Sequence, residues 1–304
     1  MVCLVLLLGY DWVVVYLLPA GLRTGDSQWS DNIIRAQRFI YEERDARVVI
    51  VGSSLSSRLV DALLPGGVTN LSLGGMSPQD GLRLLARSGA APQLVMVEAN
   101  YLPLAERGEF SEGLFRAGVL QARRHLPALR DKNRPISVMG ALLGLVARRL
   151  AGRPAEASLV VVEMQERSGP ALGAGPDPGK AGDVFDKLLE AERQGHAHAV
   201  PPELLTSARQ NVERLLKTLS GRGSRVAFFL LPTHPDICNS PRVKSARDLV
   251  SGSFSEHPYI ELGNCRSVTT TDGKHLDPAS ARVVTRELVN RLPGLLDAPA
   301  SRAR

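Results

Sequence analysis

The feature that most constrains the fold of this chain is an alternation of short apolar runs with segments of helical spacing. Arg47–Gly52 is such a run, and the apolar residues of Leu55–Leu64 after it recur at helical spacing. Further apolar runs occupy Val68–Leu73, Leu94–Val97, Arg225–Leu231 and Tyr259–Leu262. Runs that are apolar throughout are typical of parallel strands covered on both faces. The alternation therefore predicts an α/β fold with a doubly wound parallel sheet of about five strands.

Helices are expected between and after these strands. Helical spacing predicts them over Ser30–Glu43, Glu203–Leu219 and Pro278–Leu292. Ser77-Pro78 is typical of a helix start, because proline is favoured at the first helical position. We expect residues 47–296 to form one α/β domain, followed by a tail at 297–304.

A long insertion separates the third predicted strand from the fourth. It runs from about residue 101 to residue 202, too far for a simple crossover, and is expected to contain helices. Ile136–Leu150 is apolar with helical spacing. This helix either packs on the body of the domain or, alternatively, lies on a membrane surface or covers the site as a lid.

The first 22 residues are predicted to be an N-terminal membrane anchor. Met1–Leu22 has about the length that crosses a bilayer core, and it is apolar apart from Asp11 near its middle. No basic residue precedes the segment, so its orientation is poorly specified. A cleaved signal peptide and a buried apolar helix are the alternatives. With residues 23–46 as a juxtamembrane helix, the remaining chain is expected outside the cytoplasm, in the periplasm or another extracytoplasmic space.

Charge and cysteine content exclude two classes of ligand. The formal net charge is +6, but no run of five like charges occurs and aromatic residues make up only 5% of the chain, so we expect no nucleic-acid partner. The three cysteines are Cys3, Cys238 and Cys265, with neither CxxC nor zinc-site spacing, so we expect no metal and no cofactor. Cys238 and Cys265 either pair as a disulfide or remain free thiols.

Polar or glycine residues follow each of the first three predicted strands. Ser53-Ser54 follows the first, Gly74-Gly75 the second, and Asn100 the third. In doubly wound sheets, ligands bind beyond the carboxyl ends of the strands, so these residues are candidates for a site. Each alone also has a structural explanation, since serine caps helices, glycine forms tight turns and asparagine is common in loops.

A carboxylate and an imidazole stand three residues apart before the last predicted helix. Asp272 and His275 could complete a catalytic triad with a serine, because the carboxylate orients the imidazole and the imidazole takes the proton of the hydroxyl. His234, after the fourth strand, is a second candidate to line the pocket, as is Ser53. The other histidines considered, His125, His196 and His198, are expected at the surface.

The ordered set of these residues resembles the SGNH, or GDSL-type, hydrolases, over about residues 47–100 and 225–292. Gly52-Ser53-Ser54 resembles the first family block, GDS, with Ser53 in place of the aspartate. Asn70–Gly75 resembles the second block and Asp272–His275 the DxxH of the last. The third block is usually GxND, where this chain reads Glu98-Ala99-Asn100-Tyr101. The GxSxG elbow of α/β-hydrolases is absent from the sequence.

The resemblance implies a three-layer α/β/α fold and a serine enzyme that acts on esters. Ser54 would be the nucleophile, His275 the base and Asp272 its orienting carboxylate. The backbone N–H of Gly75 and the amide of Asn100 would bind the oxyanion, together with the N–H of Ser54.

With the predicted anchor, the resemblance favours O-acyl groups, above all O-acetyl, on an envelope carbohydrate. The acyl acceptor is either water, in an esterase, or a sugar hydroxyl, in an O-acyltransferase that could belong to an envelope polysaccharide-synthesis assembly. The alternative from another class is a catalytically inactive SGNH-like domain that binds a glycan or scaffolds an envelope assembly.

Overall fold

The computed structural model describes residues 2–19, 22, 24–150 and 178–297. The chain divides into two compact units. The α/β unit comprises Arg44–Gly108 and Ser168–Arg304, and the helical unit comprises Met1–Glu43 and Glu109–Arg167. The helical unit thus takes in part of the predicted insertion. Of that insertion, residues 151–177 lie outside the described residues, as does the predicted tail apart from Asp297.

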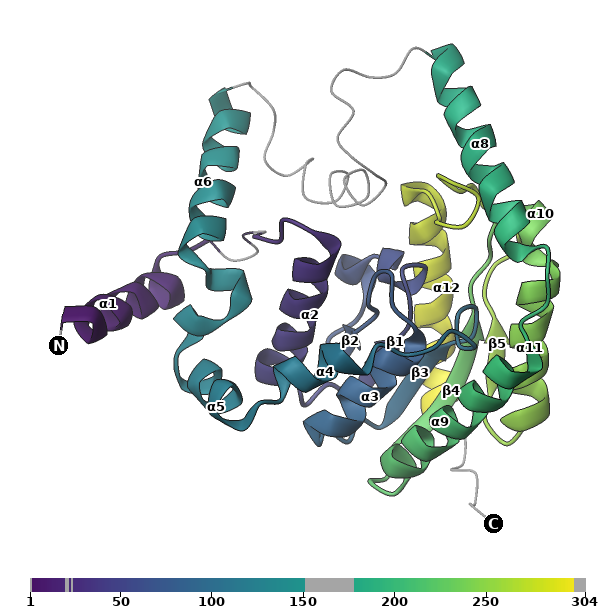
Figure 1. The fold of residues 1–304 in the computed structure, drawn as a ribbon, viewed down its shortest axis with the longest axis horizontal. Helices are drawn as coiled ribbons and strands as arrows, with labels where there is room; N and C mark the ends of the chain where they lie inside the picture. Colours follow the sequence, from purple (N-terminus) through teal and green to yellow (C-terminus); the bar gives the residue numbers. More distant parts are fainter. Residues whose placement is uncertain (1, 20–21, 23, 151–177, 298–304) are drawn as a thin grey trace. The chain divides into compact units, whose positions relative to one another are not determined.

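The α/β unit contains a five-stranded, all-parallel sheet, which confirms the predicted fold class (Figure 1). The strands follow the order β2-β1-β3-β4-β5 across the sheet. Their bounds are Val48–Val51 for β1, Val68–Asn70 for β2, Leu94–Glu98 for β3, Arg225–Leu230 for β4 and Tyr259–Glu261 for β5. Four of these strands lie within predicted apolar runs, and β3 extends one residue past its run.

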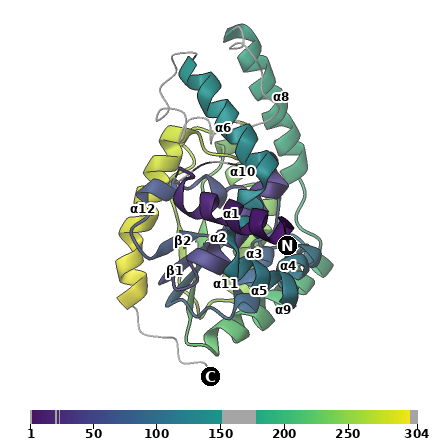
Figure 2. The ribbon, with the colours of Figure 1, turned by 90° about the vertical axis from the view of Figure 1, so that its left-hand side faces the viewer.

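Helices cover both faces of this sheet, which gives three α/β/α layers. Helices α3 and α9 pack side by side, α9 also contacts α11, and α12 lies on the opposite face (Figure 2). The helices of the unit are α3 (Pro78–Ser88), α8 (Pro178–His196), α9 (Pro202–Ser220), α10 (Pro235–Cys238), α11 (Pro241–Ser253) and α12 (Pro278–Asp297). Two short 3₁₀ helices, η1 (Ser56–Arg58) and η2 (Asp61–Leu63), precede β2.

The sheet core explains why the central strands are apolar throughout. Every residue of β1 and β3 is buried, because helices cover both faces of these strands. The two strands pair in register, with Val51 opposite Val97. The chain runs from β1 outward to β2 and then returns to β3 on the other side of β1. This reversal places the switch point, where such sheets bind ligands, beyond the carboxyl ends of β1 and β3.

The start of α3 agrees with the sequence prediction. Ser77 is the N-cap and Pro78 the first helical residue, and Ser77 and Asp80 form a reciprocal capping box. Gly89 ends the helix with φ +73°, in the left-handed region that favours glycine.

The helix predicted over Leu55–Leu64 is wrong. Instead, η1 and η2 are separated by Leu59 and Val60, whose ψ angles of 138° and 100° are not helical. The backbone N–H of Val60 donates to Thr285 Oγ1 of α12 at 3.0 Å, instead of to a carbonyl one turn earlier. A contact with α12 therefore replaces the local helical hydrogen bond.

The described part of the helical unit consists of α-helices and two short 3₁₀ helices. They are α1 (Val2–Tyr16), α2 (Gln28–Glu42), α4 (Gly108–Leu114, whose first residue belongs to the α/β unit), α5 (Ala117–His125), α6 (Pro135–Leu150) and the 3₁₀ helices η3 (Pro127–Leu129) and η4 (Asp131–Asn133). A capping box between Ser27 and Ser30 starts α2, close to the predicted start at Ser30. Inside the unit, Gln37 Oε1 accepts from the N–H of Asp131 at 2.8 Å.

Both polar residues near the middle of α1 have partners in this unit. Asp11 Oδ1 accepts from the backbone N–H of Ala128 at 2.7 Å, and the hydroxyl of Tyr10 donates to the carbonyl of Asn133 at 2.6 Å. Within the described ranges, no helix has both the length and the apolar character needed to span a bilayer. The N-terminal anchor stays a prediction.

The helix predicted over Ile136–Leu150 is confirmed as α6. It leaves large apolar side chains exposed, including Ile136 at 77% and Leu143 at 68%. Among the residues of this helix whose burial the structure describes, Val138 alone is in the buried core.

Candidate active site

The candidate nucleophile Ser54 lies in the turn that follows β1. Ser54 is half-buried, whereas Ser53, Leu55 and Ser56 around it are at most 4% exposed. Gly52 makes the turn possible, since a Cβ at this position would lie 1.9 Å from Ser56 Oγ. Ser54 is therefore the residue of this turn that reaches solvent.

Ser54, His275 and Asp272 form a continuous chain of hydrogen-bonding atoms. His275 Nε2 lies 2.8 Å from Ser54 Oγ, and His275 Nδ1 lies 2.6 Å from Asp272 Oδ2. The sequence separates Ser54 from His275 by 221 positions. The fold thus brings the three predicted catalytic residues into hydrogen-bond contact.

The Asp272 carboxylate is held in its charged form. Burial alone would raise the pKa of Asp272. The side-chain hydrogen bond and the charge of His275 lower it, as do hydrogen bonds from the backbone N–H groups of Lys274 and His275, and the resulting pKa is about 2. An ionised carboxylate only accepts hydrogen bonds, so His275 carries its proton on Nδ1 and offers Nε2 to the hydroxyl of Ser54. This is the tautomer that a general base for a serine nucleophile needs.

The loop that carries Asp272 and His275 is closed on itself and packed. The carbonyl of His275 accepts from the backbone N–H of Thr271 at 2.8 Å. Gly273 has φ +92°, and a Cβ there would lie 2.8 Å from Leu189 Cδ1 of α8. Lys274 Nζ bonds Glu192 Oε1 of α8 at 2.5 Å. Helix α8 therefore borders the loop that carries His275, the predicted base.

Gly75 lies in a turn that is tied to the end of β1. The N–H groups of Leu71 and Leu73 donate to the carbonyls of Ile50 and Gly52 at 2.7 and 2.9 Å, which continues the pairing of β2 with β1. Gly75 itself is exposed and has φ +67°, a conformation that favours glycine. The predicted oxyanion donor thus follows a segment bonded directly to the residue two positions before Ser54.

Asn100 follows β3 and is 5% exposed. Its Nδ2 donates to the carbonyl of Leu231 and its Oδ1 accepts from the N–H of the same residue, both at 2.9 Å. A side-chain amide carries two N–H hydrogens. The pair with Leu231 uses one of them, so the second is the hydrogen that an oxyanion role would require.

Ser53 and Glu98 are bound to each other beneath the turn. Ser53 Oγ donates to Glu98 Oε1 at 2.6 Å, and the N–H of Ser53 donates to Glu98 Oε2 at 2.8 Å. Ser53 is 3% exposed, so it supports the turn from inside and does not face solvent as a pocket-lining residue would. In the sequence, Glu98 stands out only as a departure from the family pattern, and that departure is the available signal.

Glu98 is fully buried at the end of β3. Burial raises the pKa of its carboxyl, and the hydrogen bonds from Ser53 and Ser56 act in the opposite direction.

His234, the second histidine candidate, caps α10. Its Nδ1 accepts from the N–H of Asp236 at 3.3 Å, and its backbone N–H donates to the carbonyl of Gly273 at 2.9 Å. The backbone of His234 thus contacts the loop that carries His275, whereas its imidazole caps the short helix α10. The ring also meets Phe185 of α8 edge to face, with centroids 6.1 Å apart.

The prediction that His196 lies at the surface is wrong. His196 is 5% exposed, its Nδ1 lies 2.9 Å from the carbonyl of Glu192, and its ring contacts Tyr101. Burial lowers the pKa of His196 and raises that of Tyr101. His125 and His198 are exposed, as predicted.

Cys238 and Cys265 are joined by a disulfide, with their Cα atoms 6.4 Å apart. Of the two alternatives left open by the sequence, the structure therefore contains the paired form. Cys238 is the last residue of α10, and Cys265 lies just beyond β5. Cys3 is free and exposed.

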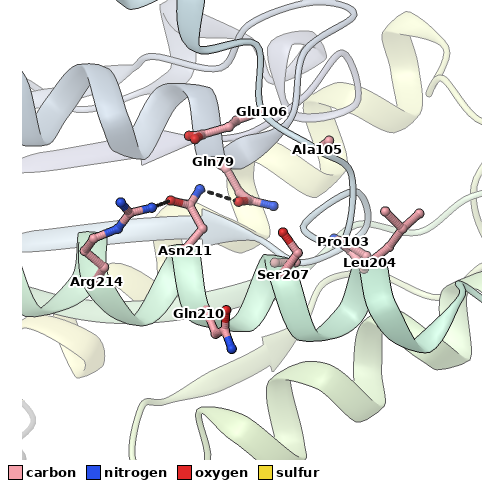
Figure 3. A pocket seen from close by; sticks show the side chains of 10 residues that line it. Gln79, Pro103, Ala105, Glu106, Leu204, Ser207, Gln210, Asn211 and Arg214 are labelled. Carbon is pink, nitrogen blue, oxygen red and sulfur yellow. Dashed lines mark hydrogen bonds between the residues drawn. The ribbon is translucent and has the colours of Figure 1, made fainter.

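A groove of about 430 Å³ lies elsewhere in the α/β unit, between α3, α9 and the 103–106 segment. Its polar groups bond one another, since Arg214 donates to Asn211 and Asn211 Nδ2 donates to Gln79 Oε1 at 2.6 Å (Figure 3). Gln79 Nε2 in turn donates to the carbonyls of Leu102 and Leu104. The predicted site residues, all within the described part of the chain, do not line this groove, and its network holds the segment after β3 against two helices.

The contacts of Ser54, His275 and Asp272 form an arrangement that could support nucleophilic acyl transfer. A hydroxyl joined to a neutral imidazole nitrogen, itself oriented by an ionised carboxylate, can attack a carbonyl carbon as its proton moves to the imidazole. Comparison with known proteins adds no assignment: no protein-family model and no curated protein matches this chain.

Proposed function

We propose that this protein is a serine-dependent ester hydrolase or O-acyltransferase that works through a covalent acyl-enzyme. The observation that supports the proposal is the chain of contacts from Ser54 Oγ through His275 to Asp272, at 2.8 and 2.6 Å. These groups meet beyond the carboxyl end of β1, next to the switch point of the sheet.

In the first half of the reaction, Ser54 Oγ attacks the acyl carbon while His275 Nε2 takes the hydroxyl proton. The carbonyl oxygen becomes an oxyanion, which the N–H groups of Ser54 and Gly75 and the second N–H of the Asn100 amide stabilise. His275 then gives its proton to the oxygen of the leaving alcohol as the ester bond breaks. The acyl group remains on Ser54.

In the second half, the acyl group leaves Ser54 for a new hydroxyl. His275 takes a proton from water or from a sugar hydroxyl, whose oxygen attacks the acyl carbon, and returns that proton to Ser54 Oγ as the enzyme ester breaks. Asp272 stabilises the imidazolium in both halves. Water as acceptor makes the protein an esterase, and a sugar hydroxyl makes it a transferase.

The proposed substrate class is O-acyl esters, above all O-acetyl, of an envelope carbohydrate, with the protein held at the membrane by residues 1–22 and the site outside the cytoplasm. The resemblance to SGNH hydrolases supports this class of substrate. The disulfide between Cys238 and Cys265 supports the compartment, because disulfides persist mainly in oxidising environments.

The test is hydrolysis of p-nitrophenyl acetate by the full chain in mild detergent, beside Ser54→Ala and the control Ser251→Ala. Ser251 is an exposed serine of α11 outside the triad. We expect Ser54→Ala to lose at least about 10³-fold in kcat, as removal of a triad serine does. Ser251→Ala should match the wild type. Equal turnover by Ser54→Ala and wild type would contradict the proposal.

The acceptor is tested by adding a neutral oligosaccharide to the same reaction and measuring acetylated sugar against free acetate. Acetyl sugar that rises with acceptor concentration identifies a transferase, and free acetate alone identifies an esterase. A folded wild-type protein that binds the oligosaccharide without turning over ester, and whose Ser54→Ala variant binds equally well, would favour the inactive glycan-binding alternative.

A further inference from the structure

Two departures from the SGNH pattern meet in the structure. The family aspartate before the nucleophile is Ser53 here, and the glycine of the third block is Glu98. The Glu98 carboxylate accepts from both the N–H and the hydroxyl of Ser53, at 2.8 and 2.6 Å. The residue that stands in place of the family aspartate is thus bonded to a carboxylate from β3.

The same carboxylate also holds the other side of the turn. Glu98 Oε2 accepts from the N–H of Ser56 at 3.2 Å and from Ser56 Oγ at 2.5 Å. Four donors from residues 53 and 56 therefore converge on one side chain that is fully buried. Ser54, which lies between them, is half-exposed and carries the hydroxyl in contact with His275.

The network continues from the turn into the segment that carries the predicted oxyanion donor. Ser56 Oγ also contacts Ser72 Oγ at 2.8 Å, and Asn70 Nδ2 donates to the carbonyl of Ser56 at 3.0 Å. Ser56 therefore links Glu98 to the residues just before Gly75. One buried carboxylate sets the relative position of two parts of the site.

We propose that Glu98 is a positioning residue, which takes over from β3 the role of the acidic residue missing at position 53 and fixes the turn of the nucleophile. Its importance for turnover rests on the proposed function. It does not touch the reacting atoms, and its effect passes through the backbone on both sides of Ser54.

The variant Glu98→Gln separates charge from shape. An amide keeps the volume but offers one acceptor oxygen, and its NH₂ group faces donors of Ser53 or Ser56. A displacement of about 1 Å in a catalytic group can cost about 10²-fold in rate. We therefore expect Glu98→Gln to lower kcat for p-nitrophenyl acetate by about 100-fold, with KM changed less than about threefold.

The decisive experiment moves the carboxylate back. Ser53→Asp alone places two acids together, and Glu98→Gly alone leaves the donors of the turn without their acceptor. The double variant Ser53→Asp/Glu98→Gly contains one carboxylate, and an aspartate at 53 can also accept from the N–H of Leu55, as Ser53 Oγ does at 3.2 Å. We expect kcat of the double variant to exceed that of each folded single variant by about tenfold or more. No such rescue would overturn the proposal.

Hydrogen exchange gives a readout that does not depend on catalysis. The amides of Ser53 and Ser56 should exchange at least about tenfold faster in Glu98→Gln than in wild type or in the control Glu256→Gln, an exposed carboxylate. If wild type neither hydrolyses the ester nor transfers its acetyl group to the oligosaccharide, the proposed function fails, and faster exchange still supports the role of Glu98 in the turn. Unchanged exchange at these two amides overturns that role whether or not the protein is an esterase.

Discussion

The side-chain amide of Asn100 and the backbone of Leu231 hold each other through two hydrogen bonds, both of 2.9 Å. The pair lies one step beyond the ladder of β3 and β4, after the bond from the N–H of Ala99 to the carbonyl of Phe229. Asn100 therefore acts as an additional rung between the two strands. These two bonds also fix the direction of the second N–H of the Asn100 amide.

Replacement of Asn100 should affect stability and turnover separately. Asn100→Ala leaves the buried N–H and carbonyl of Leu231 unpaired, which should cost about 1–3 kcal/mol of unfolding free energy. It also removes one of the proposed oxyanion donors, which should lower kcat by about 10²–10³-fold. Urea unfolding and p-nitrophenyl acetate kinetics on the same preparations measure the two effects.

Asn100→Asp serves as the partner variant. It keeps an acceptor for the N–H of Leu231 but places a carboxylate oxygen against the carbonyl. If a folded Asn100→Asp protein kept the kcat of wild type, the Asn100 amide would not bind the oxyanion.

The Asp272 carboxyl should make the protein sensitive to acid in a definite range. Its folded-state pKa of about 2 is below the ordinary value of 3.8, so the carboxylate contributes stability at pH above about 4. That contribution, about 2 kcal/mol, is lost as the pH falls through about 2. In Asp272→Asn, the unfolding free energy should therefore decline less between pH 4 and pH 2 than in wild type.

Urea titrations at pH 4, 3 and 2 test this difference, and parallel curves for both proteins would contradict it. At neutral pH, Asp272→Asn should also lower kcat by about 10⁴-fold, because the amide no longer holds the proton of His275 on Nδ1.

The sheet and the three triad residues could be predicted because their signals are local. Each strand is an apolar run, and a doubly wound sheet collects the residues that follow its strands at one edge. Ser54 follows β1, and Asp272 and His275 precede α12, so short motifs carried their identity. The order of these motifs along the chain, compared with a known family, suggested the roles that we propose for them.

Features that depend on distant contacts could not be predicted. The spacing of Leu55–Leu64 suits a helix, but Val60 is bonded to Thr285, 225 positions away. Glu98 ends an apolar strand, and nothing near it in the sequence indicates four donors from the turn of Ser54. His196 of α8 contacts Tyr101, and these two residues lie near opposite ends of the predicted insertion.

Gly52→Ala should disrupt the nucleophile turn. The added Cβ would lie 1.9 Å from Ser56 Oγ and 2.6 Å from Glu98 Oε2, both of which are buried. Because these atoms are bonded to each other, neither moves without loss of a hydrogen bond, and we expect a cost of about 1–3 kcal/mol. Turnover should fall with it, since Ser54 is two residues away.

The matched control is Gly66→Ala, where a Cβ would meet nothing within 4 Å. Thermal melting and kcat of the two variants should differ clearly, and equal values would show that the turn of Gly52 yields without cost.

Reduction of the disulfide should lower stability more than it lowers turnover of the folded protein. The bond closes a loop of 27 residues, for which chain entropy predicts about 3.5 kcal/mol. The disulfide anchors α10, and Ile237 of this helix lies close to Gly273. The backbone N–H of His234, just before α10, donates to the carbonyl of Gly273. The triad itself bonds directly through Ser54 and His275, so the reduced protein should keep most of its kcat while it remains folded.

Urea unfolding with and without a phosphine reductant measures the loss, with Cys265→Ser as the genetic equivalent. Cys3→Ser, at a free and exposed cysteine, is the control and should behave as wild type in both conditions. If oxidised and reduced proteins unfolded at the same urea concentration, the bond would contribute nothing to the folded state. If reduction abolished turnover at urea concentrations well below those that unfold the protein, the prediction would be wrong. Helix α10 would then have to position the loop of Asp272 and His275.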